Sequence, residues 1–117
     1  MNAIEKKAED LAAVMTAIAD MPDEDRAIAE KLHEIIMTSA PNLVPRTWYG
    51  MPAYQNNGKI ICFFRSRKKF GERYMTLGFN DTAKIDEGTM WPINFAIISL
   101  TDKYEAAIAE LIKKSVS

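Results

Sequence analysis

Cysteine and histidine are almost absent from this 117-residue chain, which has one of each, Cys62 and His33. A single cysteine excludes an intrachain disulfide, and one cysteine with one histidine cannot form a standard zinc site. No run of 18 apolar residues occurs, and the first residues carry acids where a signal peptide needs a basic flank followed by an apolar stretch. We therefore expect one globular domain over residues 1–117, located in the cytoplasm and not in a membrane.

Familiar catalytic motifs are also missing. The chain has no glycine-rich nucleotide loop and no His-Glu-x-x-His metalloprotease motif. Its only thiol, Cys62, is far in sequence from its only imidazole, His33, so a nucleophile and base pair is not indicated. We expect Cys62 to be a small buried hydrophobe and His33 to flank the apolar face of a helix.

Charge is sorted along the chain although the net charge is only −1. Residues 1–40 carry a net charge of −5, residues 41–80 carry +6, and residues 81–117 carry −2. The pattern is compatible with an acidic helical face and a basic loop or sheet edge. Because the pI is about 5.8 and the basic patch is short, general nucleic-acid binding is not expected.

Apolar periodicity predicts three helices. The first covers about residues 3–19, with an apolar stripe at steps of three and four made by Ile4, Ala8, Leu11, Met15 and Ile18. The second should run from a cap at Asp20 to about Ser39, with Ile28, Leu32, Ile35 and Ile36 on its apolar face. Thr101-Asp102 opens the last helix, whose apolar face is Tyr104, Ala107, Ile108, Leu111 and Ile112.

The middle of the chain predicts strands. Asn57-Gly58 is a strong signal for a type I′ hairpin turn between the run Trp48–Asn56 and the run Lys59–Phe64. With this turn, Tyr54 should face Ile61 and Pro52 should face Phe63. Further strands are expected at about Arg73–Asn80 and Asn94–Leu100. The fold class is therefore α+β, a two-layer antiparallel sheet with helices on one face, in the order α-α-β-β-β-β-α.

Carboxylates on the second helix are the candidate metal ligands. Glu30-x-x-His33 matches the spacing of one half of a di-iron site in helix bundles, and Glu34 lies one turn beyond Glu30. A looser arrangement is an exposed carboxylate ridge that could attract ferrous iron without enclosing it, made by Asp20, Asp23, Glu24, Asp25, Glu30 and Glu34. The alternative is a solvated polar face of the helix.

Aromatic residues suggest a second candidate site. Trp48, Tyr49, Met51 and Tyr54 occur within seven positions, and Trp91 stands between Met90 and Pro92. If these segments converge, they could line a pocket in which Arg46, Arg65 or Arg67 holds a small anionic group. Two alternatives remain, since the aromatics could close the open end of the core or form a homodimer surface.

Two long segments resemble a known family. PNLVPRTWYGMPAYQNNGKIICFF, at residues 41–64, and MWPINFAIISLTDKYEAAIAELIKKSV, at residues 90–116, resemble the bacterial YdhG-like domains, also named DUF1801. The resemblance implies an α+β domain with an antiparallel sheet. Part of that family is described as frataxin-like iron chaperones that donate iron for haem and iron-sulfur assembly. Such a role here would rest on the acidic residues of the second helix.

The favoured function is therefore a non-enzymatic cytoplasmic binding protein, with iron delivery as the form that the resemblance implies. The alternatives are a small anionic-ligand binder or enzyme that uses residues 48–54 with Trp91, and a homodimeric interaction domain. Iron is the only cofactor or cargo indicated, and the chain could act as a monomer or a homodimer.

Overall fold

The computed structural model describes residues 1–117 as a five-stranded antiparallel sheet with four helices. The strands are adjacent in chain order: β1 (Val44–Trp48), β2 (Met51–Asn56), β3 (Lys59–Arg65), β4 (Met75–Phe79) and β5 (Asn94–Ile97). The helices are α1 (Ala3–Ala19), α2 (Asp23–Ser39), α3 (Arg67–Phe70) and α4 (Asp102–Ser115). The predicted α+β class and antiparallel sheet are confirmed. One strand, β1, and the short helix α3 were not predicted.

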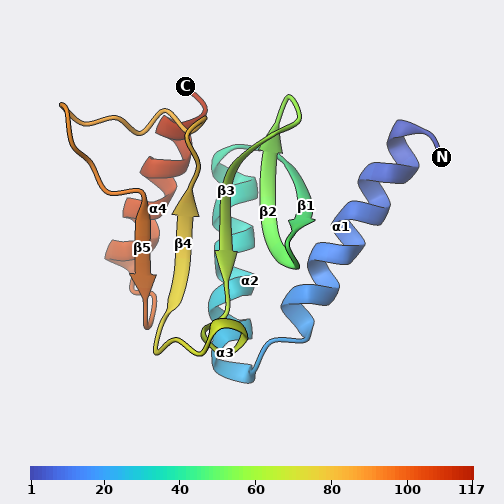
Figure 1. Cartoon of the computed structure of the whole chain (residues 1–117), viewed down its shortest axis with the longest axis horizontal. Coiled ribbons are helices and arrows are strands. Elements are labelled where there is room, and N and C mark those ends of the chain that lie inside the picture. The colour runs from blue at the N-terminus through green and yellow to red at the C-terminus, as the bar shows by residue number, and fades with distance from the viewer.

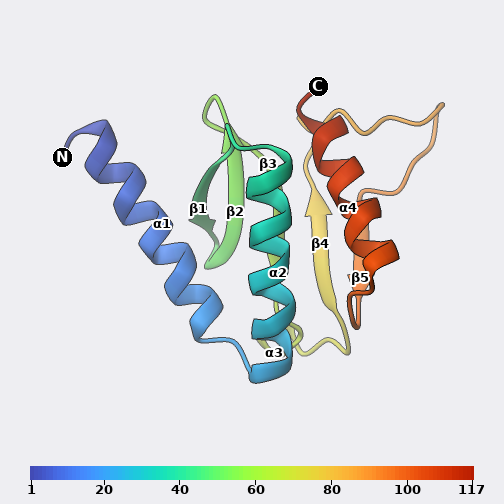
Figure 2. The ribbon, with the colours of Figure 1, turned by 180° about the vertical axis from the view of Figure 1, so that it is seen from behind.

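Two of the three long helices lie over one face of the sheet. Figures 1 and 2 show α2 and α4 side by side over one face, whereas α1 lies beside the β1 edge. The core between these layers is a cluster of 21 buried residues; its largest fully buried side chains include Tyr54, Phe64, Leu32, Ile36 and Met75. No helix has both the length and the apolar content needed to cross a membrane.

Helix α1 forms as predicted but buries less than predicted. Asn2 caps it, because the Asn2 side chain accepts a hydrogen bond of 2.8 Å from the Glu5 N–H. Its buried residues are Val14 and Ile18, whereas Ile4 is 81% exposed. Figure 1 shows the reason, since the N-terminal half of α1 extends away from the sheet and has no surface to pack against.

Helix α2 packs as predicted but begins later. All four predicted apolar-face residues, Ile28, Leu32, Ile35 and Ile36, are buried. Asp20 is not its cap: the Asp20 N–H bonds to the Thr16 carbonyl and closes α1. Pro22 occupies the N-cap position of α2 without a side-chain hydrogen bond. The acids of the first turn stabilise this helix start through the helix dipole.

Two consecutive hairpins share the same turn geometry. Asn57 and Gly58 have φ of 53° and 79°, as the predicted type I′ turn requires. Tyr49 and Gly50 have φ of 50° and 75°, and they join Trp48 to its partner Met51. The segment expected to be one strand over residues 48–56 is therefore the end of β1, a tight turn and β2.

The register of the second hairpin changes beyond its turn. Asn56 pairs with Lys59 as predicted, but Tyr54 pairs with Cys62 instead of Ile61, and Phe63 pairs with Ala53 instead of Pro52. The two pairs Gln55–Ile60 and Tyr54–Cys62 leave Ile61 without a partner. Ile61 is the extra residue of a β-bulge, which lets both Ile61 and Cys62 reach the core.

The later elements agree with the prediction apart from their lengths. β4 covers Met75–Phe79 and β5 covers Asn94–Ile97, both shorter than expected. Thr101 caps α4, with its hydroxyl accepting from the Tyr104 N–H. Ile108 and Ile112 of α4 are buried, but Tyr104 of the predicted apolar face is 54% exposed.

Candidate functional site

A hollow lies beside the β1–β2 turn, and we call it the hairpin hollow. Its volume is about 500 Å³, and it opens to solvent. Three parts of the chain line it: the second half of α1 with the α1–α2 connection, the β1–β2 hairpin, and the junction of β3 with α3. The lining residues are Ala13, Thr16, Ala17, Asp20, Met21, Pro22, Thr47, Gly50, Met51, Pro52, Arg65, Ser66, Lys68 and Lys69.

Positive charge dominates the walls of the hairpin hollow. Arg65, Lys68 and Lys69 contribute three cations, and Asp20 contributes the only carboxylate. Hydroxyl groups of Thr16, Thr47 and Ser66 supply further hydrogen-bonding groups. An open hollow with excess positive charge and several hydroxyls attracts small anions.

The three cations differ in how far they are already engaged. Arg65 donates from Nε and Nη2 to the Glu72 carboxylate at 3.1 and 3.4 Å, and its guanidinium lies 4.6 Å from the Phe70 ring centre. Lys69 Nζ donates to the Tyr49 carbonyl at 2.7 Å. Lys68 has neither a hydrogen bond nor an ion pair with the protein. Its ammonium group is therefore the one most available to a ligand.

Gly50 is required for the position of Lys69. Its φ of +75° favours glycine, and a Cβ at this position would collide with Lys69 Nζ. The absence of a side chain lets the lysine reach across the turn to the Tyr49 carbonyl. The Tyr-Gly-Met-Pro sequence at residues 49–52 thus contains the hairpin turn, and it also leaves space for the ammonium group of Lys69, one of the cations of the hairpin hollow.

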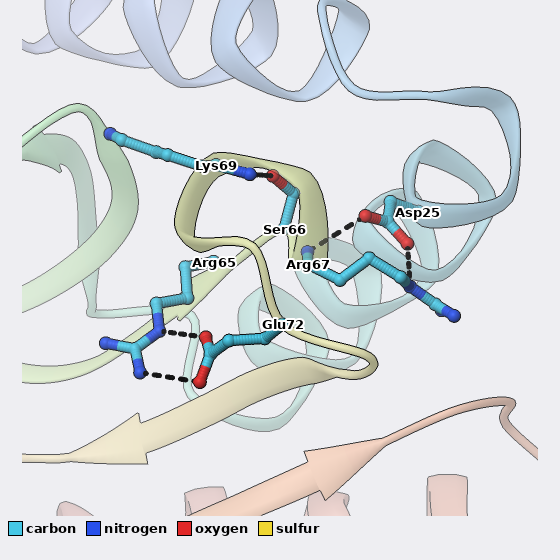
Figure 3. A network of polar contacts seen from close by, with 6 residues as sticks. All are labelled: Asp25, Arg65, Ser66, Arg67, Lys69 and Glu72. Carbon is cyan, nitrogen blue, oxygen red and sulfur yellow. Dashed lines mark hydrogen bonds and ion pairs between the residues drawn. The ribbon is translucent and has the colours of Figure 1, made fainter.

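A buried ion pair holds α3 against α2 (Figure 3). The Asp25 side chain, in the first turn of α2, is 1% exposed and accepts from Arg67 twice, from Nε at 2.6 Å and from the backbone N–H at 3.0 Å. Arg67 Nη2 is buried without a partner. Because Lys68 and Lys69 follow Arg67 directly, this ion pair fixes the segment that carries two of the three cations.

Two residues of the predicted pocket do line the hairpin hollow, namely Met51 and Arg65. Arg67 stands next to it but is bound to Asp25. Arg46 is exposed on β1, where its Nε donates to the Thr47 carbonyl at 3.2 Å. Neither Arg46 nor Arg67 is among the lining residues.

The predicted aromatic residues do not converge. The Trp48 ring packs edge-on against Tyr49 and Phe63, with ring centres 5.1 and 5.4 Å away. Tyr49 is 79% exposed, whereas Tyr54 is fully buried in the core. Trp91 lies near the opposite edge of the sheet, where it lines a separate hollow with Phe95 of β5. The expectation that Trp48 and Trp91 share one pocket is therefore wrong.

Sequence reasoning missed most of the walls of the hairpin hollow. Lys68 and Lys69 contribute to the positive charge of residues 41–80, but nothing in the sequence places them beside α1. One sequence signal could have found part of the hollow. Reading Tyr49-Gly50 as a hairpin turn predicts that Met51 pairs with Trp48. The contribution of Ala13, Thr16 and Ala17 follows only from the docking of α1.

The candidate metal ligands are not gathered into a cage. No group of three or more histidine, cysteine, aspartate or glutamate side chains is close enough to hold a metal ion. Asp23 pairs with Arg26 at 2.8 Å, and Glu34 lies 3.6 Å from Lys31. Glu30 is exposed. His33 Nδ1 forms a hydrogen bond of 2.8 Å with the Tyr54 hydroxyl, so only its Nε2 remains free.

Cys62 is a buried core residue and His33 is a half-buried residue of α2, and neither forms a nucleophile and base pair with the other. Cys62 is fully buried, and burial raises the pKa of its thiol far above the neutral range. The Cys62 thiol therefore stays protonated and unreactive. Burial, with a smaller contribution from Cys62, also raises the pKa of the Tyr54 phenol. Tyr54 remains a neutral hydrogen-bond partner of His33.

His33 is expected to make the fold less stable in acid. Burial lowers the pKa of His33 below its ordinary value of 6.5, so the unfolded chain binds this proton at a higher pH than the folded chain. The contribution of His33 is complete above pH 6.5 and is lost as the pH falls through the lower folded pKa. Urea denaturation between about pH 8 and pH 5 measures this dependence.

The matched variant for this measurement is His33→Gln, which keeps a hydrogen-bonding side chain but does not titrate. Because the chain has no other histidine, its free energy of unfolding should vary much less across this pH range. An identical pH dependence in His33→Gln would contradict the assignment to His33.

Comparison with known proteins identifies no relative of this chain. No protein-family model matches the chain, and no curated protein or solved structure matches it either.

Proposed function

We propose that the protein is a cytoplasmic binding protein that holds a small anionic ligand in the hairpin hollow. The observation that carries this proposal is the excess of positive charge there, since Lys68 and Lys69 stand against the single carboxylate of Asp20 and the third cation, Arg65, is paired with Glu72. The Lys68 side chain has no hydrogen bond or ion pair within the protein, and this free ammonium group supports the same proposal. A phosphate or carboxylate group of the ligand would contact Lys68 and Lys69, with Ser66 or Thr47 as hydroxyl donors.

The local structure supports a site formed before the ligand arrives. The ion pair between Asp25 and Arg67 fixes the start of α3, and the bond from Lys69 to the Tyr49 carbonyl ties α3 to the hairpin. The apolar walls from Met51 and Pro52 would accept the uncharged body of a ligand. Little conformational entropy would be lost on binding, because these walls are already in place.

Titration calorimetry with inorganic phosphate tests the proposal. We expect saturable binding that weakens about tenfold in Lys68→Gln, because one charge-assisted contact is lost. Lys59→Gln is the matched control, since Lys59 is an exposed lysine at the other hairpin turn and does not line the hollow. Equal affinities for these two variants, or no saturable binding by the unmutated protein, would reject the hairpin hollow as an anion site.

Delivery of ferrous iron, as in the YdhG-like resemblance, is the competing proposal. Its support is the exposure of the α2 carboxylates, 94% for Asp23 and 69% for Glu34. Because no three donors are gathered, iron would contact single carboxylates and exchange readily. Saturable binding of ferrous iron that is weakened in Glu30→Gln and Glu34→Gln, with no effect of Lys68→Gln, would favour iron over the anionic ligand.

A further inference from the structure

One edge of the sheet is left open for pairing. β5 pairs with β4 on one side and has no strand on the other. The Ile93 carbonyl accepts from the Phe79 N–H, so by alternation the backbone groups of Asn94 and Ala96 point away from β4. Unpaired N–H and C=O groups along an edge strand can accept another strand.

The other edge of the sheet differs. β1 contains Pro45 and the charged Arg46, and α1 packs against it. Proline, charge and a covering helix are the usual means of preventing edge pairing. The stretch from Asn94 to Leu100 has neither a charged residue nor a proline. Proline, charge and a helix therefore protect β1, whereas β5 is limited only by its length of four residues.

An apolar groove runs beside the open edge, between β5 and α4. Its volume is about 420 Å³, and nine of its ten lining residues are hydrophobic. Ile98 and Tyr104 line it and are 55% and 54% exposed. We call this surface the β5–α4 groove, made by Phe95, Ala96, Ile97, Ile98, Ser99, Leu100, Tyr104, Ala107, Ile108 and Leu111.

We propose that the β5–α4 groove binds the same groove of a second copy of the chain, forming a two-fold symmetric dimer. In this dimer β5 pairs antiparallel with β5 of the other copy through Asn94 and Ala96. In this joined sheet, neighbouring strands are about 4.8 Å apart. Each α4 covers two strands of its own copy, so the axes of the two α4 helices are two strand spacings, about 10 Å, apart. This is a normal helix packing distance. The two α4 helices thus become neighbours, as α2 and α4 already are.

The charges of α4 favour a second copy over an unrelated partner. Lys103 and Glu110 flank one side of the stripe formed by Tyr104, Ala107 and Leu111 at helical spacing, and the exposed ion pair of Glu110 with Lys113, at 3.4 Å, leaves the Glu110 carboxylate able to take a second cation. A two-fold axis makes the two α4 helices antiparallel. When they cross at Ala107, Lys103 of each copy lies opposite Glu110 of the other, and Tyr104 lies opposite Leu111.

Sedimentation analysis tests the dimer, because the monomer mass is 13.2 kDa. We expect the unmutated protein to approach twice this mass as its concentration rises. Ile98→Lys and Ala96→Pro should both remain monomeric, the first by placing a charge in the groove and the second by removing an outward N–H. Tyr49→Lys is the control, since Tyr49 is exposed at the far edge of the sheet.

A charge-reversal cycle tests the orientation. Lys103→Glu and Glu110→Lys should each raise the dimer dissociation constant by about three- to tenfold, and the double variant should restore it. A mass of 13.2 kDa for the unmutated protein at all concentrations would overturn the proposal. A dimer that is lost in Tyr49→Lys but kept in Ile98→Lys would overturn it as well and move the interface to the β1–β2 turn.

Discussion

Asp25→Ala is expected to lower the free energy of unfolding by about 3 kcal/mol, because it removes a buried carboxylate that accepts two hydrogen bonds from Arg67 and leaves that guanidinium, 20% exposed, with only the exposed Glu24 carboxylate at 3.6 Å. Asp25 is 1% exposed and accepts hydrogen bonds from both the side chain and the backbone of Arg67. The guanidinium already contains one buried nitrogen, Nη2, without a hydrogen bond. Urea denaturation monitored by circular dichroism measures the loss.

The control for this experiment is Asp23→Ala in the same helical turn. Asp23 is 94% exposed and pairs with Arg26 at the surface, so its loss should change stability by less than about 0.5 kcal/mol. The double variant Asp25→Leu with Arg67→Met removes both charges and should recover most of the stability. Equal effects of Asp25→Ala and Asp23→Ala would show that the ion pair does not contribute as its burial indicates.

Tyr54→Ala is the second change with a large expected effect, a loss of about 3–5 kcal/mol. Tyr54 is fully buried, and its ring lies 6.0 Å from the ring of Phe64 and 5.7 Å from that of His33. Removing the ring leaves a cavity under α2 and leaves His33 without its hydrogen-bond partner. Tyr54→Phe keeps the ring and should cost only about 1 kcal/mol, through the lost hydrogen bond.

Tyr49 provides the comparison, because it belongs to the same aromatic segment but is 79% exposed. Tyr49→Ala should change the free energy of unfolding by less than about 0.5 kcal/mol. Thermal or urea denaturation of both variants separates their roles. A loss in Tyr49→Ala as large as that in Tyr54→Ala would mean that the β1–β2 turn is as strongly packed as the core.

The helices and the class of the sheet could be predicted because local signals determine them. The buried face of α2 follows from its apolar spacing, and Thr101 at the start of α4 is a direct capping signal. The turn at Tyr49-Gly50 was missed because tyrosine rarely adopts the positive φ that Asn57 adopts readily. The bulge at Ile61 was missed because alternation alone assumes a regular ladder.

The candidate site was harder to predict because its walls come from separated parts of the chain. Arg65 and Met51 were selected for their chemistry, and both line the hairpin hollow. Lys68 and Lys69 were visible as charge, but their place beside α1 depends on Asp25 holding α3 to α2. Trp91, like Trp48, stands close to a methionine and a proline in the sequence. The strand order nevertheless places the two tryptophans near opposite edges of the sheet.

The weak anchoring of α1 gives the hairpin hollow one adjustable wall. Only Val14 and Ile18 fix this helix in the core, whereas the opposite walls belong to the hydrogen-bonded sheet and to α3. Segments with few buried apolar contacts open at a lower free energy than the core. A shift of this wall to admit a larger ligand has to move only these two side chains while the sheet remains folded, and the amides of α1, first those of its exposed N-terminal half, should exchange with solvent deuterium before those of β2 and β3.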